Sequence, residues 1–136
     1  MATLPKTVTV VEVGPRDGLQ NEAARISTTD KIAFVDRLSL AGLREIEVSA
    51  FVSPKWIPQL DDAEDVFAGI TRKPGVRDSA LVPNVNGLER AIGAGVTDIA
   101  IFLAASETFS QRNTNRSIDA SFEAYRNVAS MATTAG

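Results

Sequence analysis

Two stretches of this sequence, AGLREIEV at 41–48 and AGVTDIAI at 94–101, share one pattern of residues. Each begins with Ala-Gly and an apolar residue, and each continues through an acid to Ile and a second aliphatic residue. This is the composition of a helix end, a glycine turn and the start of a strand, because glycine readily adopts the backbone conformation that ends helices. The repetition predicts that the chain reuses one βα building block.

Segments rich in β-branched and aliphatic residues extend this reading in both directions. They predict strands at 7–13, 44–51, 79–83 and 97–104. The first, TVTVVEV, is almost continuously apolar, which is typical of a strand buried on both faces of a parallel sheet. Gly14-Pro15 ends it.

Amphipathic or capped segments predict helices between these strands. They lie at 31–42 behind the capping residues 27–30, at 61–70, at 87–94, and from Ser117 onward. The last helix carries Ile118, Phe122, Tyr125 and Ala129 along one side. Strands alternating with helices predict a parallel sheet covered by helices, hence an α/β fold.

Two architectures fit this order. A doubly wound open sheet would be complete at this length, whereas a (β/α)8 TIM-type barrel needs about 250 residues, so that only about the first four βα units would be present. The turn GPRDG at 14–18 is neither a dinucleotide-binding fingerprint nor a P-loop, which argues against a nucleotide site.

Composition narrows the classes of partner. The apolar fraction is 44%, the formal net charge is −3 and no stripe of Lys and Arg is present, so we expect no nucleic-acid or membrane partner, although a small anionic substrate remains compatible. The chain has no Cys and no His, which removes thiolate chemistry and the commonest general base. No apolar run approaches the roughly 18 residues of a membrane span, and no targeting segment is recognisable, so a cytoplasmic location is expected.

Polar residues follow the predicted strands at the edge where parallel α/β folds place their sites. They are Arg16, Asp17 and Gln20 after the first strand, Glu47 and Ser49 in the second, Asn84 after the third, and Ser106 and Glu107 after the fourth. Glu47 interrupts an apolar strand, and burying its carboxylate is unfavourable without a partner. Arg16 is the natural partner.

These groups support two interpretations. Two carboxylates and an amide near one edge could hold Mg²⁺ or Mn²⁺, with Arg16 stabilising negative charge on a carbonyl oxygen. Alternatively, Arg16 and Asp17 form a local ion pair in a turn, Glu47 faces solvent and Asn84 is a turn residue. Trp56 is read as a loop anchor rather than a ligand-stacking platform.

The segments VEVGPRDGLQNE (11–22) and IEVSAFVSPKWIPQLDD (46–62) closely resemble the hydroxymethylglutaryl-CoA lyase family. LVPNVNGLERAIGAG (81–95) and IFLAASETFSQRNTNRSIDASFE (101–123) resemble it too, so the resemblance covers nearly the whole chain. It implies a (β/α)8 barrel, of which residues 1–136 would form the N-terminal half of the lyase domain.

The resemblance also implies an activity and roles for residues. The activity is metal-dependent cleavage of 3-hydroxy-3-methylglutaryl-CoA to acetyl-CoA and acetoacetate, a step of leucine degradation. Asp17 would be a metal ligand, and Arg16 would bind substrate and stabilise the enolate. Glu47 would support the site near the metal, Gln20 would help to shape it, and Asn84 would bind substrate. We expect an acyl-CoA substrate, a homo-oligomeric full-length form and, in a eukaryote, the mitochondrial matrix.

Other family features have no counterpart in this sequence. The family's His-x-His pair, a later Asn ligand and a Cys on a glycine-rich loop are not matched, and Ala50 stands where many relatives carry a hydroxyl residue. We therefore expect this polypeptide alone to be inactive. A half-barrel would also expose the edges of its first and fourth strands, so we expect the polypeptide to self-associate or aggregate. Two alternatives remain: a related synthase acting on a 2-oxo acid and acetyl-CoA, against which the SPKW loop argues, and a truncated, non-catalytic binding chain.

Overall fold

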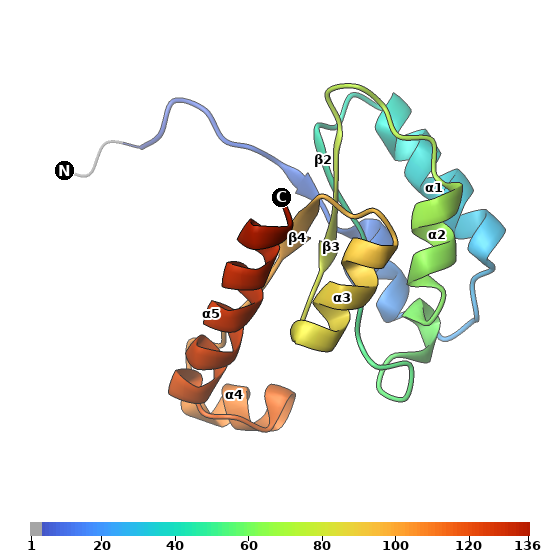
Figure 1. Ribbon diagram of the computed structural model, residues 1–136. Helices are drawn as coiled ribbons and strands as arrows, with labels where there is room; N and C mark the ends of the chain where they lie inside the picture. Colours follow the sequence, from blue (N-terminus) through green and yellow to red (C-terminus); the bar gives the residue numbers. More distant parts are fainter. Residues whose placement is uncertain (1–3) are drawn as a thin grey trace.

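The computed structural model describes residues 4–136 and contains a four-stranded parallel sheet (Figure 1). The strands are β1 (Val11–Glu12), β2 (Glu45–Ala50), β3 (Arg77–Leu81) and β4 (Asp98–Ala100), in the spatial order β1-β2-β3-β4. A doubly wound sheet would reverse its strand order at a switch point, and this one does not. The uninterrupted order is that of a (β/α)8 barrel, as one of the two predicted architectures requires.

Helices follow the strands in an arc along the sheet (Figure 1). They are α1 (Thr28–Leu40), α2 (Ala63–Gly69), α3 (Val85–Gly93), α4 (Glu107–Thr114) and α5 (Ile118–Ala135). Serine or asparagine side chains cap four of them, since Ser27, Asn84, Ser106 and Ser117 each accept a hydrogen bond from a backbone N–H in the first turn.

The repeated Ala-Gly motif does what its composition predicts. Gly42 follows α1 and Gly95 follows α3, and both have positive φ angles, 88° and 71°. A left-handed residue at this position ends the helix and turns the chain toward the next strand, which begins three residues later in each copy.

The main hydrophobic core lies between the sheet and the helices. Its largest fully buried side chains include Ile46 and Phe51 from the β2 region and Val35, Leu88 and Val128 from three helices. A smaller cluster joins Ala50, Leu60 and Leu81. One extra residue between Glu47 and Ser49 shifts the β2–β3 register, so Ala50 pairs with Leu81.

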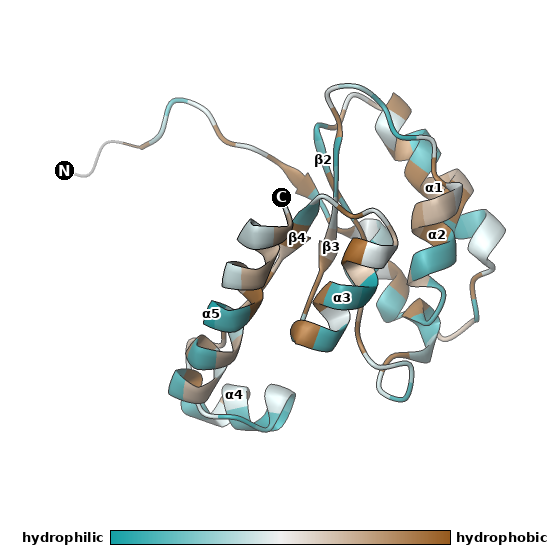
Figure 2. Ribbon diagram, viewed as in Figure 1, coloured by the Kyte–Doolittle hydropathy of each residue, from teal (hydrophilic) through white to brown (hydrophobic). Residues whose placement is uncertain are grey.

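The first strand differs from the prediction. It is confined to Val11–Glu12, and the valines before and within it are exposed rather than buried, with Val8 at 78% and Val10 at 64%. β1 is an edge strand that pairs only with β2, so no second neighbour covers it. Figure 2 shows hydrophobic residues on β1, the short arrow into which the N-terminal segment leads.

Other boundaries also moved. β3 begins at Arg77 instead of 79, β4 is only Asp98–Ala100, and α2 begins at Ala63 after a short 3-10 turn, Pro58–Leu60. Helix α4 was not predicted, because its residues ETFSQRNT are mostly polar and show no apolar stripe. In residues 4–136 no helix is long and apolar enough to cross a membrane.

Candidate active site

The chain after β1 forms one tight hydrogen-bonded turn, Gly14–Gly18, that presents Arg16 and Asp17. The Val13 carbonyl accepts hydrogen bonds from the N–H groups of Arg16 (3.2 Å), Asp17 (2.7 Å) and Gly18 (3.3 Å). A Cβ at Gly14 would lie 2.7 Å from Glu12 Oε1, which accepts the Gly14 N–H, so a larger residue there would have to displace this flexible carboxylate. The turn is therefore determined by the backbone and holds the two polar side chains at the end of the strand.

Arg16 binds two carboxylates of very different exposure. Its Nε donates to Glu47 Oε1 and its Nη1 donates to Asp17 Oδ1 at 2.7 Å. The Glu47 side chain is only 8% exposed, whereas that of Asp17 is 54% exposed. The expected partnership of Arg16 with Glu47 is present, and the buried carboxylate is compensated as its position in the strand requires.

The other predicted site residues have separate places. Gln20 lines a shallow pocket of about 360 Å³ between the segment after β1 and the loop after β2, together with Arg25 and Trp56. Trp56 is 85% exposed, so its side chain is not packed within residues 4–136, and its interpretation as a packed loop anchor is wrong. Ser49 is buried in β2.

Three candidates act as helix caps or links. Asn84 Oδ1 accepts from Gly87 N at 2.9 Å and begins α3, and Ser106 Oγ accepts from Phe109 N and begins α4. Glu107 accepts from Ile118 N at 3.2 Å and so joins the starts of α4 and α5. Each of these polar groups thus has a structural hydrogen-bond partner. For Asn84 this agrees with its alternative interpretation as a residue of the turn before a helix.

The residues present fit a metal ion only in part. Among residues 4–136, no three His, Cys, Asp or Glu side chains are grouped as metal ligands. Asp17 has an exposed carboxylate, but Glu47 is engaged by Arg16. A hard divalent cation prefers several oxygen ligands. Asp17 fits as one of these, and a full coordination sphere needs more than this turn supplies.

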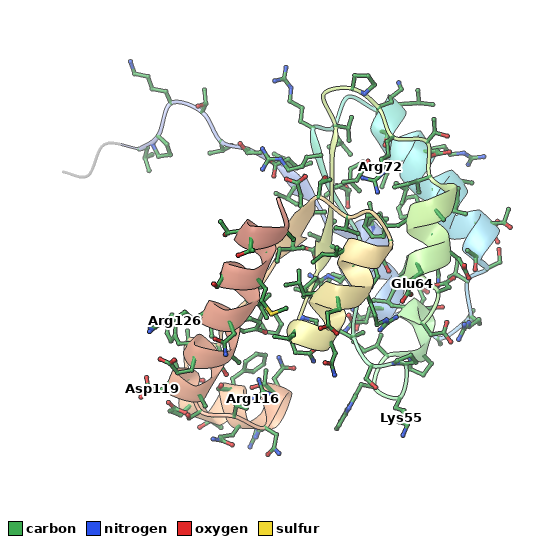
Figure 3. The ribbon with its side chains drawn as sticks, viewed as in Figure 1. Lys55, Glu64, Arg72, Arg116, Asp119 and Arg126 are labelled. Carbon is green, nitrogen blue, oxygen red and sulfur yellow. The ribbon has the colours of Figure 1, made fainter. Side chains whose placement is uncertain are left out.

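A larger hollow of about 640 Å³ lies at the opposite edge of the sheet, among Arg44, Arg72, Arg77 and Asp98. Figure 3 shows Arg72 at this end, whereas Lys55 and Arg116 lie at the end toward which the strands point. Asp78 also lines it, and Asp78 Oδ1 is buried without a hydrogen-bond partner among the described residues. Burial raises the pKa of the Asp78 carboxyl. These charges lie at the starts of the strands, whereas the Arg16 turn lies at a strand end. The larger volume of this hollow therefore does not identify it as the active site.

A cluster that the sequence reading did not single out joins the two loops of the site. Lys31, Gln59 and Asp62 are buried or nearly so and are linked by hydrogen bonds. One signal was available, because Lys31 stands four residues before the core residue Val35 on the same helix face. Its partners lie on another segment and could not be read from spacing.

Comparisons with known proteins agree with this geometry. A family model described as HMGL-like matches residues 7–136. A Pseudomonas aeruginosa protein named 3-hydroxy-3-isohexenylglutaryl-CoA/hydroxy-methylglutaryl-CoA lyase is 58% identical over 122 residues, which are 90% of this chain and 41% of that protein.

Two solved structures are similar as well. The hydroxymethylglutaryl-CoA lyase of Pseudomonas aeruginosa superposes with a TM-score of 0.91 at 56% identity, covering 96% of this chain and 44% of that one. A lyase of Acinetobacter baumannii in complex with coenzyme A and 3-methylmalate gives a TM-score of 0.88 at 37% identity, covering 96% and 43%. The chain thus spans about two-fifths of the length of these relatives and forms part of such a barrel.

Proposed function

Because the chain belongs to the HMGL-like family, we propose that its residues form part of the active site of a lyase that cleaves 3-hydroxy-3-methylglutaryl-CoA to acetyl-CoA and acetoacetate. The observation that carries the proposal is Arg16, which is oriented by the buried Glu47 beside the exposed Asp17. The complex of a relative with coenzyme A supports an acyl-CoA substrate.

The reaction makes two electrostatic demands. The 3-hydroxyl group loses its proton as the bond between C3 and the thioester α-carbon breaks, and the electron pair of that bond passes to the acetyl-CoA enolate, which is then protonated. A guanidinium fixed next to the thioester oxygen lowers the energy of that enolate. Glu47 holds Arg16 Nε, which sets the direction of the guanidinium before substrate arrives.

Asp17 is proposed as a ligand of a divalent cation, Mg²⁺ or Mn²⁺. When bound, such a cation would lower the pKa of the substrate hydroxyl. The contact between Arg16 Nη1 and Asp17 Oδ1 keeps the guanidinium and this carboxylate side by side. Gln20 is proposed to shape the pocket and Asn84 to contact substrate through its remaining amide donor. Leucine degradation and a cytoplasmic or mitochondrial location stay predictions.

The test is acetoacetate release by the protein in the form that its source organism produces. We expect Arg16→Lys to lower kcat by at least about a hundredfold, because a lysine ammonium cannot reproduce the guanidinium geometry. The matched control is Arg126→Lys on α5, whose arginine lies 3.6 Å from Glu123 on an exposed helix face. Loss of less than threefold in Arg16→Lys, or no release by the unaltered protein, would contradict the proposal.

The name of the Pseudomonas aeruginosa relative favours one second candidate substrate. That protein is named for 3-hydroxy-3-isohexenylglutaryl-CoA as well as the methyl compound, and it shares 58% identity with this chain. Both thioesters undergo the same bond cleavage and differ only in the substituent at C3. Assaying the two in parallel assigns the preference, and the role of Arg16 is the same for each.

A further inference from the structure

A buried polar cluster ties the segment after β1 to the loop after β2. Lys31 is 3% exposed and Gln59 is 8% exposed. Lys31 Nζ donates to the backbone carbonyl of Gln59 and to Asp62 Oδ1 at 2.7 Å, and Asp62 Oδ2 accepts from Thr28 Oγ1 at 2.7 Å. Burial acts to raise the pKa of the Asp62 carboxyl, but the hydrogen bonds from Lys31 and Thr28 outweigh it and lower that pKa.

The side chain of Gln59 forms hydrogen bonds with the backbone of residues 22–26. Its Nε2 donates to Ala24 O at 2.8 Å and to Glu22 O at 3.4 Å, and its Oε1 accepts from Ile26 N at 3.1 Å. Arg25 reaches back and donates to Pro58 O at 2.8 Å. The two segments are therefore pinned by bonds running in both directions.

This arrangement favours a defined position more than it favours stability. A buried ion pair often contributes little net stability compared with apolar residues of the same volume, because both charges lose their hydration. A fully satisfied polar network does, however, admit only one geometry. The geometry enforced here is that of two loops at the carboxyl edge of the sheet.

The pinned segment connects directly to the Arg16 turn. Asn21 N donates to Gly18 O and Glu22 N donates to Leu19 O, so hydrogen-bonded turns run without a break from residue 14 to residue 22. This continuous run of hydrogen bonds is the path by which a displacement at Glu22 would reach Arg16 and Asp17. On the other side, Arg16 is held through Glu47 in the sheet.

We propose that Gln59, fixed by Lys31 and Asp62, is a positioning residue for the Arg16–Asp17 turn. It acts through the backbone of residues 22–26 and does not touch substrate. The proposal rests on the proposed function, because the turn it positions is the one assigned to catalysis.

The experiment compares Gln59→Leu with a control variant at Asp36. Gln59 lies just before α2 and bonds to the segment before α1, whereas Asp36 links α1 to a residue just beyond α2. Asp36 on α1 accepts from Thr71 N at 2.8 Å and from Thr71 Oγ1 at 3.1 Å, just beyond α2. Both variants are expected to lower the melting temperature. Gln59→Leu should also lower kcat by about ten- to a hundredfold, since small misplacements of catalytic groups are that costly. Asp36→Ala should leave kcat within about twofold, because its bonds lie away from the turn.

A second variant supplies a pH signature. In Gln59→Glu the carboxylate would face the carbonyl oxygens of Glu22 and Ala24, and protonation would restore a donor. Its kcat relative to the unaltered protein should therefore recover as the pH falls, whereas that of Gln59→Leu should not change with pH. A residue that mattered only for folding would give no such recovery in the folded protein.

Amide hydrogen exchange of residues 14–26 separates this proposal from the proposed function. Faster exchange there in Gln59→Leu but not in Asp36→Ala supports positioning even if the unaltered protein cleaves no acyl-CoA. Unchanged exchange in residues 14–26 would overturn the proposal. Equal losses of kcat in Gln59→Leu and Asp36→Ala would overturn it too.

Discussion

Arg16 meets one carboxylate from inside the sheet and one from its own turn. Glu47 is nearly enclosed, so its charge must be matched by a neighbouring cation, and the match holds the guanidinium in place. Asp17 is half-exposed, and its Oδ1 accepts from Arg16 while its Oδ2 is the oxygen left for the divalent cation proposed above. The two acids therefore differ in role: Glu47 orients the Arg16 guanidinium, whereas the carboxylate of Asp17 remains accessible from solvent.

Asp78 presents the opposite situation, a buried carboxyl with an unpartnered oxygen at the other edge of the sheet. Burial raises its pKa, Arg72 acts against the shift, and Asp36 and Asp98 add to it. Because the pKa of Asp78 is raised in the folded state, the contribution of this residue to stability is fully present at pH values below the ordinary pKa of an aspartate carboxyl. It is lost as the pH rises through the folded-state value.

Asp78→Asn should therefore raise the free energy of unfolding by about 1 kcal/mol at pH 7 and by much less near pH 4. Chemical denaturation of both proteins at the two pH values measures this. The control is Asp65→Asn on an exposed position of α2. A gain at pH 4 equal to that at pH 7 would show that the Asp78 charge is not the cause.

Among the elements, the helix caps show how one residue type can suggest two roles. Asn84 follows a strand, as a substrate-binding amide would, and it also begins α3 through its side-chain oxygen. Aspartate can replace that oxygen acceptor, whereas alanine cannot.

Asn84→Ala should lower the free energy of unfolding by about 1 kcal/mol, and Asn84→Asp should leave it nearly unchanged. If the remaining amide donor also binds substrate, Asn84→Asp should raise KM severalfold in a protein of normal stability. Thermal unfolding and substrate titration of both variants decide the matter. A normal KM in Asn84→Asp would leave capping as the role of this residue.

The sequence predicted the positions of those site residues that lie in or just after a strand. It missed the residues whose role depends on hydrogen bonds to segments distant in the sequence. Arg16, Asp17 and Glu47 could be placed because apolar runs show where strands end, and the unfavourable burial of Glu47 demanded a cation. Helix α4 offers no apolar stripe, so its N-cap Ser106 and its first residue Glu107 were interpreted as site residues. Gln59 bonds to backbone atoms 35 residues away, and no local pattern reports such bonds.

At the scale of the whole molecule, the strand order explains both the site and an exposed surface. Parallel strands that neighbour one another in sequence order have their carboxyl ends at one edge of the sheet. That edge collects the Arg16 turn and the loop after β2. The same order leaves β1 and β4 each with a single neighbour.

We predict that the 136-residue polypeptide by itself self-associates through these strand edges, since unpaired backbone groups on an edge strand pair readily with another chain. Val11→Lys should reduce that association, because a charged side chain on an edge strand disfavours pairing. Val11 lies in β1 and is 43% exposed, and Ile92 on α3 is equally exposed, so Ile92→Lys is the matched control. Sedimentation velocity at several concentrations should show a smaller species only for Val11→Lys. If both lysine variants shift the distribution alike, general hydrophobic exposure drives association, and a monodisperse unaltered monomer would refute edge pairing altogether.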